Sequence, residues 1–234
     1  MGIAGSLGVS LGKSLGKSVA PQVHRFAPEV TAGFVREALH RAVVGVGPMP
    51  GAATVAERML RFRDGDRAAA ITDVIENHVR LAGAQGFATN LGGMVTAAVT
   101  IPANITGLAL LQARMVAAIA FLRGYDIDDP RVRNAILACM LGEDTVRGLV
   151  RKRKMPAPPM AIATAPSHDP HLDLVMAAEV TSELLTRVAG KKMVTTIGRR
   201  VPVVGGLFGA GADGYATWQI GRYADRELLP RALR

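Results

Sequence analysis

Residues 81–113 read LAGAQGFATNLGGMVTAAVTIPANITGLALLQA, and no charged side chain occurs among them. The whole chain carries 28 Lys and Arg, so a run of this length without charge is unusual in it. Such a run has to be shielded from water by the rest of the fold, by a partner or by a bilayer. Pro102 divides the run, because proline cannot continue the hydrogen-bond ladder of an α-helix. We therefore expect two apolar helices that pack closely as a hairpin turned at Pro102.

The run also meets some of the requirements of a membrane span, which needs about 20 predominantly apolar residues. Its first half, however, contains Gln85, Asn90 and several glycines and threonines. The helix expected after Pro102 carries Arg114 near its middle, at a cost of about 2.5 to 3.5 kcal/mol for insertion. These features favour a water-soluble helical core that associates with a membrane peripherally over an integral span.

The composition favours helices over sheets. Hydrophobic residues make up 49% of the chain, whereas aromatic residues make up only 4%. Apolar residues recur at helical spacing in five stretches, which are residues 29–46, 52–62, 67–85, 103–123 and 172–188. Asp66 and the acidic residues before Pro130 are suited to cap two of the helices. The expected fold is all-α, with a single helical domain over residues 21–234 and a proline-rich linker at about 152–170.

A second glycine-rich stretch, residues 201–223, is expected to pack against the central run. Gly205 and Gly209 lie four residues apart, and Asp213 falls one turn later on the same helical stripe. A face without side chains lets another helix approach closely. The natural partner is the central run, which contains Gly92 and Gly93.

The first 20 residues contain a Ser-Leu-Gly repeat of period four. On a helix this spacing places three leucines along one stripe, and lysines follow at the end of the later repeats. The residues concerned are Leu7, Leu11, Leu15, Lys13 and Lys17. Glycine weakens a helix by roughly 1 kcal/mol per residue relative to alanine. The segment is therefore either a flexible tail or an amphipathic helix that forms against a membrane surface.

The formal net charge is +9, so the chain should bind anions. Two basic clusters are candidates for contact with anionic membrane lipid or a membrane protein. They consist of Arg61, Arg63 and Arg67, and of Arg151, Lys152, Arg153 and Lys154. Nucleic acid is not expected as a partner, because aromatic residues for base stacking are scarce and the usual RNA- and DNA-binding motifs are absent from the sequence.

No catalytic residue, metal site or cofactor is expected. No pair among the five histidines has the i, i+4 spacing that places two ligands on one helix face. The Gly-x-Ser-x-Gly pattern occurs only within the Ser-Leu-Gly repeat, at 8–12 and 12–16, and no Val- and Ile-rich strand precedes it. Cys139 is the single cysteine, and it is interpreted as a small buried hydrophobic residue of a helix.

Polar residues within the apolar helices are more informative, because an unpaired charge in a low-dielectric interior costs several kcal/mol. Asn104 and Arg114 lie in the helix after Pro102, and Asp213 lies in the second glycine-rich stretch. One hypothesis is that Arg114 and Asp213 pair and fix the register of their two helices. The alternative is that each side chain reaches the surface.

Several blocks of this sequence resemble the EcsC family, which is named for a component encoded beside a bacterial ABC transporter. The blocks are QGFATNLGG at 85–93, IPANI at 101–105, GYDIDDP at 124–130, VPVVGG at 201–206 with Asp213, and GRYA at 221–224. The chain departs from the family at Asn104, where many members have Asp. The resemblance implies a helical, membrane-associated protein and supplies no catalytic residue.

These observations lead to an expected function and two alternatives. The expected function is a non-enzymatic protein that binds anionic lipid or a membrane partner on the cytoplasmic side. One alternative is a lipid-acting or transporter-linked enzyme with its site near Asn104, Arg114 and Asp213. The other is a soluble homo-oligomeric scaffold whose small-residue helices form the interface.

Overall fold

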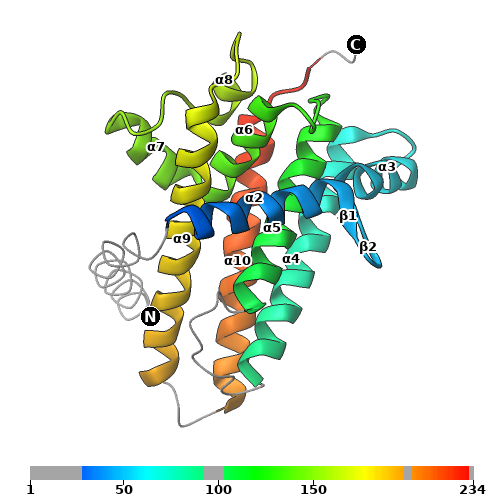
Figure 1. Cartoon of the computed structure of the whole chain (residues 1–234). Coiled ribbons are helices and arrows are strands. Elements are labelled where there is room, and N and C mark those ends of the chain that lie inside the picture. The colour runs from blue at the N-terminus through cyan, green and yellow to red at the C-terminus, as the bar shows by residue number, and fades with distance from the viewer. Residues whose placement is uncertain (1–27, 92–102, 198–201, 232–234) are drawn as a thin grey trace.

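The fold is all-α, as the sequence predicts. A computed structural model describes residues 28–91, 103–197 and 202–231, and nine helices occur among them (Figure 1). They are α2 (Pro28–Val44), α3 (Ala52–Phe62), α4 (Arg67–Leu91), α5 (Ala103–Leu122), α6 (Pro130–Leu141), α7 (Glu143–Arg151), α8 (Pro159–Ala163), α9 (Pro170–Ile197) and α10 (Pro202–Glu227). Two short antiparallel strands of two residues each join α2 to α3. They are β1 (Gly45–Val46) and β2 (Met49–Pro50).

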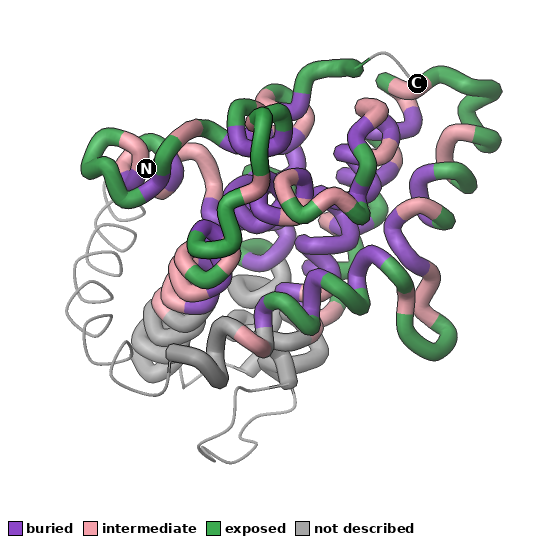
Figure 2. The backbone as a smooth tube through the Cα atoms, turned by 45° about the horizontal axis from the view of Figure 1, so that its top comes forward, coloured by how far each residue is buried: buried purple, intermediate pink, exposed green. Residues whose placement is uncertain are grey.

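Helix α5 is the centre of the core. Its sequence is apolar on every side, and a helix of this kind has to be surrounded by others. Every residue from 111 to 120 is buried, and α2, α3, α4, α6 and α10 all pack against the helix. Buried residues gather where the helices meet, and exposed residues lie along the outer turns (Figure 2).

The two glycine-rich segments pack together, which confirms the expectation from their sequences. Helices α4 and α10 form the most extensive contact between elements and run antiparallel. A Cβ atom at Gly221 of α10 would lie 3.0 Å from Cγ1 of Ile75 and 3.2 Å from Sδ of Met115. Gly214 lies beside Val79, with 3.6 Å between its ideal Cβ position and the Val79 carbonyl oxygen. Small residues therefore set the close approach of α10 to α4.

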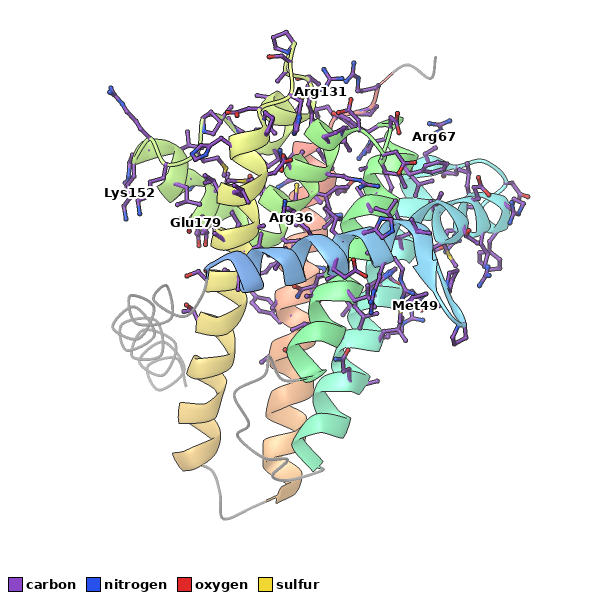
Figure 3. All side chains as sticks on the ribbon, viewed as in Figure 1. Arg36, Met49, Arg67, Arg131, Lys152 and Glu179 are labelled. Carbon is purple, nitrogen blue, oxygen red and sulfur yellow. The ribbon has the colours of Figure 1, made fainter. Side chains whose placement is uncertain are left out.

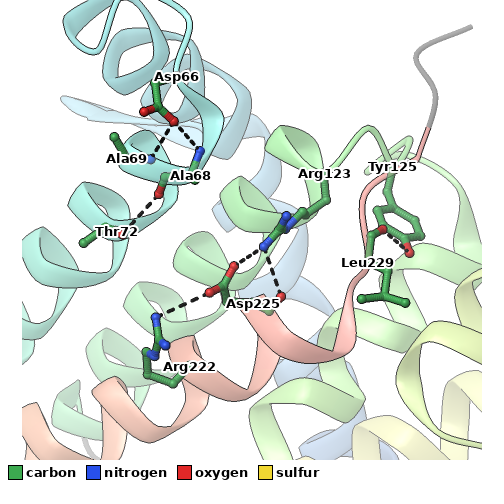
Figure 4. A network of polar contacts seen from close by, with 9 residues as sticks. All are labelled: Asp66, Ala68, Ala69, Thr72, Arg123, Tyr125, Arg222, Asp225 and Leu229. Atoms are coloured by element: carbon green, nitrogen blue, oxygen red, sulfur yellow. Dashed lines mark hydrogen bonds and ion pairs between the residues drawn. The ribbon is translucent and has the colours of Figure 1, made fainter.

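Two predicted helix caps are present. The Asp66 carboxylate accepts hydrogen bonds from the backbone N–H groups of Ala68 and Ala69, at 2.9 and 3.0 Å, at the start of α4 (Figure 4). Asp129 accepts from the Arg131 backbone N–H at 2.8 Å, and Pro130 occupies the first turn of α6. Each cap satisfies N–H groups that the first helical turn leaves without a partner.

The proline-rich segment at 152–170 differs from the open linker that its composition suggests. Met155 is 1% exposed, and α8 forms within the segment and packs against α6. This short helix starts after Pro158, which has an extended backbone, with Pro159 in its first turn. Proline suits the first turn because its φ is already helical and its missing N–H would have no helical partner there. The His168 imidazole then contacts Asp173 of α9 at 2.8 Å. The segment therefore folds onto the domain.

Charged residues hold one end of the bundle together, which we call the charged end. It comprises the start of α4, the ends of α5 and α10, and α7. Arg123 pairs with Asp225, and the Tyr125 hydroxyl donates to the Leu229 carbonyl at 3.0 Å (Figure 4). Arg226 of α10 pairs with Glu143 of α7 at 2.7 Å.

Candidate functional site

The opposite end of the bundle carries no charge on three of its helices. We call it the uncharged end and define it as residues 81–91 of α4, 103–113 of α5 and 202–212 of α10. Because α4 runs antiparallel to both other helices, its end meets the beginnings of α5 and α10 (Figure 1). These stretches contain about eleven residues each, or roughly 16 Å of helix at 1.5 Å per residue.

Helix α9 adds positive charge to the same end. Four residues separate its last residue from the first of α10, so α9 ends beside the uncharged end. Its last three turns contain Arg187, Lys191 and Lys192, and the sequence continues with Arg199 and Arg200. No Asp or Glu occurs in residues 184–212 or in residues 81–113. This end of the molecule therefore combines apolar helices with basic residues, without acidic residues in those segments.

A buried polar pair lies just before the uncharged stretch of α4 and just after that of α5. The Nε–H of Arg114 donates to Nε2 of His78 at 3.2 Å, and Arg114 is only 6% exposed. The other imidazole nitrogen, Nδ1, lies 2.7 Å from the Val74 carbonyl oxygen and can only be a donor there. His78 is therefore the neutral tautomer with its proton on Nδ1. Burial and, to a smaller extent, the nearby Arg114 charge lower its pKa to about 4.

A second buried polar pair joins α5 to α10. The Gln112 amide donates to the Thr217 hydroxyl at 3.2 Å, and both side chains are 0% exposed. Asp213 lies one turn before Thr217 and is 2% exposed. Arg114 and Asp213 are both buried, so the alternative that each reaches the surface is wrong, whereas their pairing stays a prediction beside the contact of Arg114 with His78. The rotation of α5 turns Arg114 towards α4.

Each arginine of the cluster Arg61, Arg63 and Arg67 has a polar neighbour within the fold. Arg63 forms a two-pronged ion pair with Asp73, at 2.6 and 2.7 Å. This contact lowers the pKa of the Asp73 carboxyl group. Arg67 donates to the carbonyl of Leu122 at 3.2 Å, and Arg61 lies near Glu57. The pair of Arg63 with Asp73 joins the end of α3 to α4, while Arg61 and Arg63 remain exposed at the surface.

The second basic cluster is exposed but lies far from the uncharged end. Arg151, Lys152, Arg153 and Lys154 are all exposed, and none forms an ion pair with another described residue. Lys152 projects away from the helices (Figure 3). The cluster follows α7, which the ion pair between Arg226 and Glu143 holds at the charged end. One flat membrane therefore cannot contact this cluster and the uncharged end together.

The remaining predicted site residues cannot be placed at the level of side chains. Leu7, Leu11, Leu15, Lys13, Lys17, Gly92 and Gly93 lie outside the described residues. Asn104 lies in α5, and Gly205 and Gly209 lie in α10, but their surroundings are outside the description.

Sequence reasoning missed the role of His78. His78 is one of the five histidines, and it lies between Val74 and Val79 in the stretch 67–85 that is predicted to be helical from its apolar spacing. A titratable side chain within such a stripe was the available signal, because buried polar groups nearly always have a partner. The partner, Arg114, lies on another helix, and the spacing of residues along α4 does not indicate it.

A comparison with protein families gives one match: the model of the EcsC protein family matches residues 52–233. No curated protein matches the chain. No solved structure matches it either. Among the described helices, none is both long enough and apolar enough to cross a membrane.

Proposed function

The chain belongs to the EcsC protein family, and we propose that it is a non-enzymatic, membrane-associated protein that binds anionic lipid on the cytoplasmic side. In this proposal the uncharged end faces the membrane. The apolar helices α4 and α5 enter the interface, and the last turns of α9 contact the lipid head groups.

The observation that carries the proposal is the charge distribution at the uncharged end. Three helix ends without charge lie beside a basic helix end, and the segments that form this end contain no acidic residue. An apolar surface next to basic residues is the combination that amphipathic elements use to bind anionic membranes. Each Lys or Arg near such a surface contributes about 1 kcal/mol.

The same charges limit the depth of insertion. Lys191 and Lys192 lie within two turns of the end of α9, and a charge at the bilayer centre costs about 2.5 to 3.5 kcal/mol on insertion scales. The favourable position for these lysines is therefore at the head groups. We expect shallow, peripheral binding that depends on anionic lipid.

Vesicle flotation tests the proposal. The full chain is mixed with vesicles of phosphatidylcholine alone or with added phosphatidylglycerol, at physiological salt. We expect it to float only with the anionic vesicles. Lys191→Gln with Lys192→Gln should weaken binding roughly 30-fold, since two charges are worth about 2 kcal/mol.

The matched control removes two exposed lysines from the charged end. Lys152→Gln with Lys154→Gln changes the net charge by the same amount and should leave flotation unchanged. Equal loss in both double variants would show that net charge alone controls binding. Failure of the unmodified protein to float with anionic vesicles would contradict the proposed function.

A further inference from the structure

The second basic cluster, residues 151–154, consists of four consecutive cations that the fold leaves unpaired. Each is exposed, and none forms an ion pair or a side-chain hydrogen bond with another described residue. Other exposed arginines pair with a glutamate one turn away on their own helix. These pairs are Arg41 with Glu37, Arg61 with Glu57, Arg80 with Glu76 and Arg147 with Glu143. All 19 Asp and Glu residues lie within the described ranges, so the cluster is open to an anion from outside the chain.

The backbone presents these cations on a fixed turn at the end of α7. The Lys154 N–H donates to the Leu149 carbonyl at 2.9 Å. The Arg153 N–H donates to the Val150 carbonyl at 3.0 Å, which completes a Schellman motif. Met155 follows directly, and its side chain is 1% exposed in the core. The turn is therefore anchored on both sides, so an anion that binds there orders little additional backbone.

Arg153 occupies the position at which this motif usually has glycine. Its φ is 56°, in the left-handed region, where a Cβ atom is unfavourable. Glycine would suit the turn better, and Arg151 already places a cation in the last turn of α7, where it interacts favourably with the helix dipole. Strained backbone positions of this kind gather at functional sites. The charge of Arg153, rather than the turn, therefore accounts for arginine at this position.

The size and surroundings of the cluster favour a short acidic protein segment over a larger polyanion. Helix α7 begins with Glu143 and Asp144, about 12 Å before Arg151 at 1.5 Å per residue, so the basic area is short. No large apolar side chain among residues 126–173 is exposed to add a membrane anchor. Residues 126–207 contain no Phe, Tyr or Trp on which a base could stack. The carboxylates of an acidic segment can each accept charge-assisted hydrogen bonds from these arginines and lysines.

We propose that residues 151–154 form a docking surface for an acidic segment of a partner protein. The cluster lies at the charged end, so this surface is separate from the uncharged end and does not depend on the proposed function. In the proposed orientation the docking surface faces away from the membrane, and a partner bound there is held beside it.

Fluorescence anisotropy of the full chain with a labelled hexaglutamate peptide tests the docking surface. A hexaglutamine peptide is the uncharged control, and a thymidine hexanucleotide tests nucleic acid as the occupant. At low ionic strength we expect hexaglutamate to bind at least tenfold more tightly than hexaglutamine and more tightly than the hexanucleotide, with an affinity that falls as salt is added. Equal affinity for the two peptides would overturn the proposal. An affinity for the hexanucleotide that equals or exceeds that for hexaglutamate would overturn it as well, in favour of nucleic acid.

Two double variants assign the binding to the cluster. Lys152→Gln with Lys154→Gln should weaken hexaglutamate binding at least tenfold. Lys191→Gln with Lys192→Gln removes the same charge from α9 and should leave the affinity for the peptide unchanged. Equal weakening in both would show that net charge attracts the peptide and would overturn the proposal. Vesicle flotation separates the two proposals, because the same variants have the opposite expected effects there. Loss of flotation in the Lys152 and Lys154 variant alone would assign the cluster to the membrane and overturn the docking surface.

Arg153→Gly separates the charge of the cluster from the stability of the fold. Glycine adopts the left-handed φ without strain, so the free energy of unfolding measured in urea should not be lower than that of the unmodified protein. The loss of one charge should nevertheless weaken hexaglutamate binding about fivefold. Unchanged affinity in this folded variant would show that the arginine serves no docking role and would overturn the proposal.

Discussion

His78 shows how one buried side chain links the fold to pH. Its imidazole is 0% exposed between α4 and α5, donates from Nδ1 to the Val74 carbonyl and accepts from Arg114 at Nε2. Both nitrogens are used only in the neutral state, because a protonated imidazole could not accept the hydrogen bond from Arg114. Desolvation and the Arg114 charge therefore keep the ring uncharged and lower its pKa to about 4.

This pKa predicts a loss of stability in mild acid. His78 titrates near 6.5 when the chain is unfolded and near 4 when it is folded, so the unfolded state takes up the proton first as the pH falls. The contribution of neutral His78 to the free energy of unfolding is constant above about pH 6.5. It is lost progressively as the pH falls from 6.5 to 4. Because of His78, the free energy of unfolding measured in urea should be about 2 kcal/mol lower at pH 5 than at pH 7.

Two histidine variants provide the check. His78→Gln should show a smaller difference between pH 7 and pH 5 than the unmodified protein. His40→Gln, at an exposed position on α2, should show the same difference as the unmodified protein. An NMR titration that gave His78 a pKa near 6.5 would contradict the assignment.

At the scale of elements, local signals in the sequence predicted the helices well. The α3 bounds, the Asp66 cap and the Asp129 cap before Pro130 all follow from side chains next to each other in the chain. The register between helices was harder, because it depends on how α5 rotates against α4 and α10. The sequence identified Arg114 and Asp213 as polar residues in apolar helices but did not indicate the contact between Arg114 and His78. This rotation of α5 determines that Arg114 contacts His78.

Gly221 provides a test of the close packing between α10 and α4. Its ideal Cβ position lies between Ile75 and Met115, at 3.0 and 3.2 Å, and both side chains are buried. Gly221→Val should destabilise the fold through overpacking, which typically costs about 1–3 kcal/mol. Gly211→Val is the matched control, because no atom lies within 4 Å of that position on the same helix. The free energy of unfolding measured in urea should be lower for Gly221→Val than for Gly211→Val by this amount. Equal stabilities would show that α10 moves away from α4 without cost.

At the scale of the molecule, the two ends of the bundle have different chemistry. Ion pairs join α3, α4, α5, α7 and α10 at the charged end, whereas the uncharged end has apolar helices beside the basic end of α9. Charges separated by more than about 8 Å are largely screened at physiological salt. In the proposed orientation, the basic residues 151–154 should therefore be too far from the membrane to affect binding to it.

The fluorescence of the single tryptophan, Trp218, tests the proposed orientation of the molecule on a membrane. Trp218 is 46% exposed, stacks on Tyr215 and lies about 24 Å along α10 from Pro202 at 1.5 Å per residue. Shallow binding leaves it in water, so its emission maximum should not move when anionic vesicles are added. A chain with Trp218→Phe and Phe87→Trp carries the reporter on the uncharged part of α4 and should shift to shorter wavelength. A shift of the Trp218 emission maximum would indicate deeper insertion than the charges of α9 favour.

The central position of α5 also has a consequence for biosynthesis. The ribosome makes α5 before α10, and four further helices are made between them. Until α10 emerges, the surfaces of α4 and α5 that it covers remain open, and the Gln112 amide has no Thr217 to bond. Nascent chains with exposed apolar helices are prone to aggregate. The order of synthesis therefore leaves the faces of α4 and α5 that α10 covers exposed while four further helices are made.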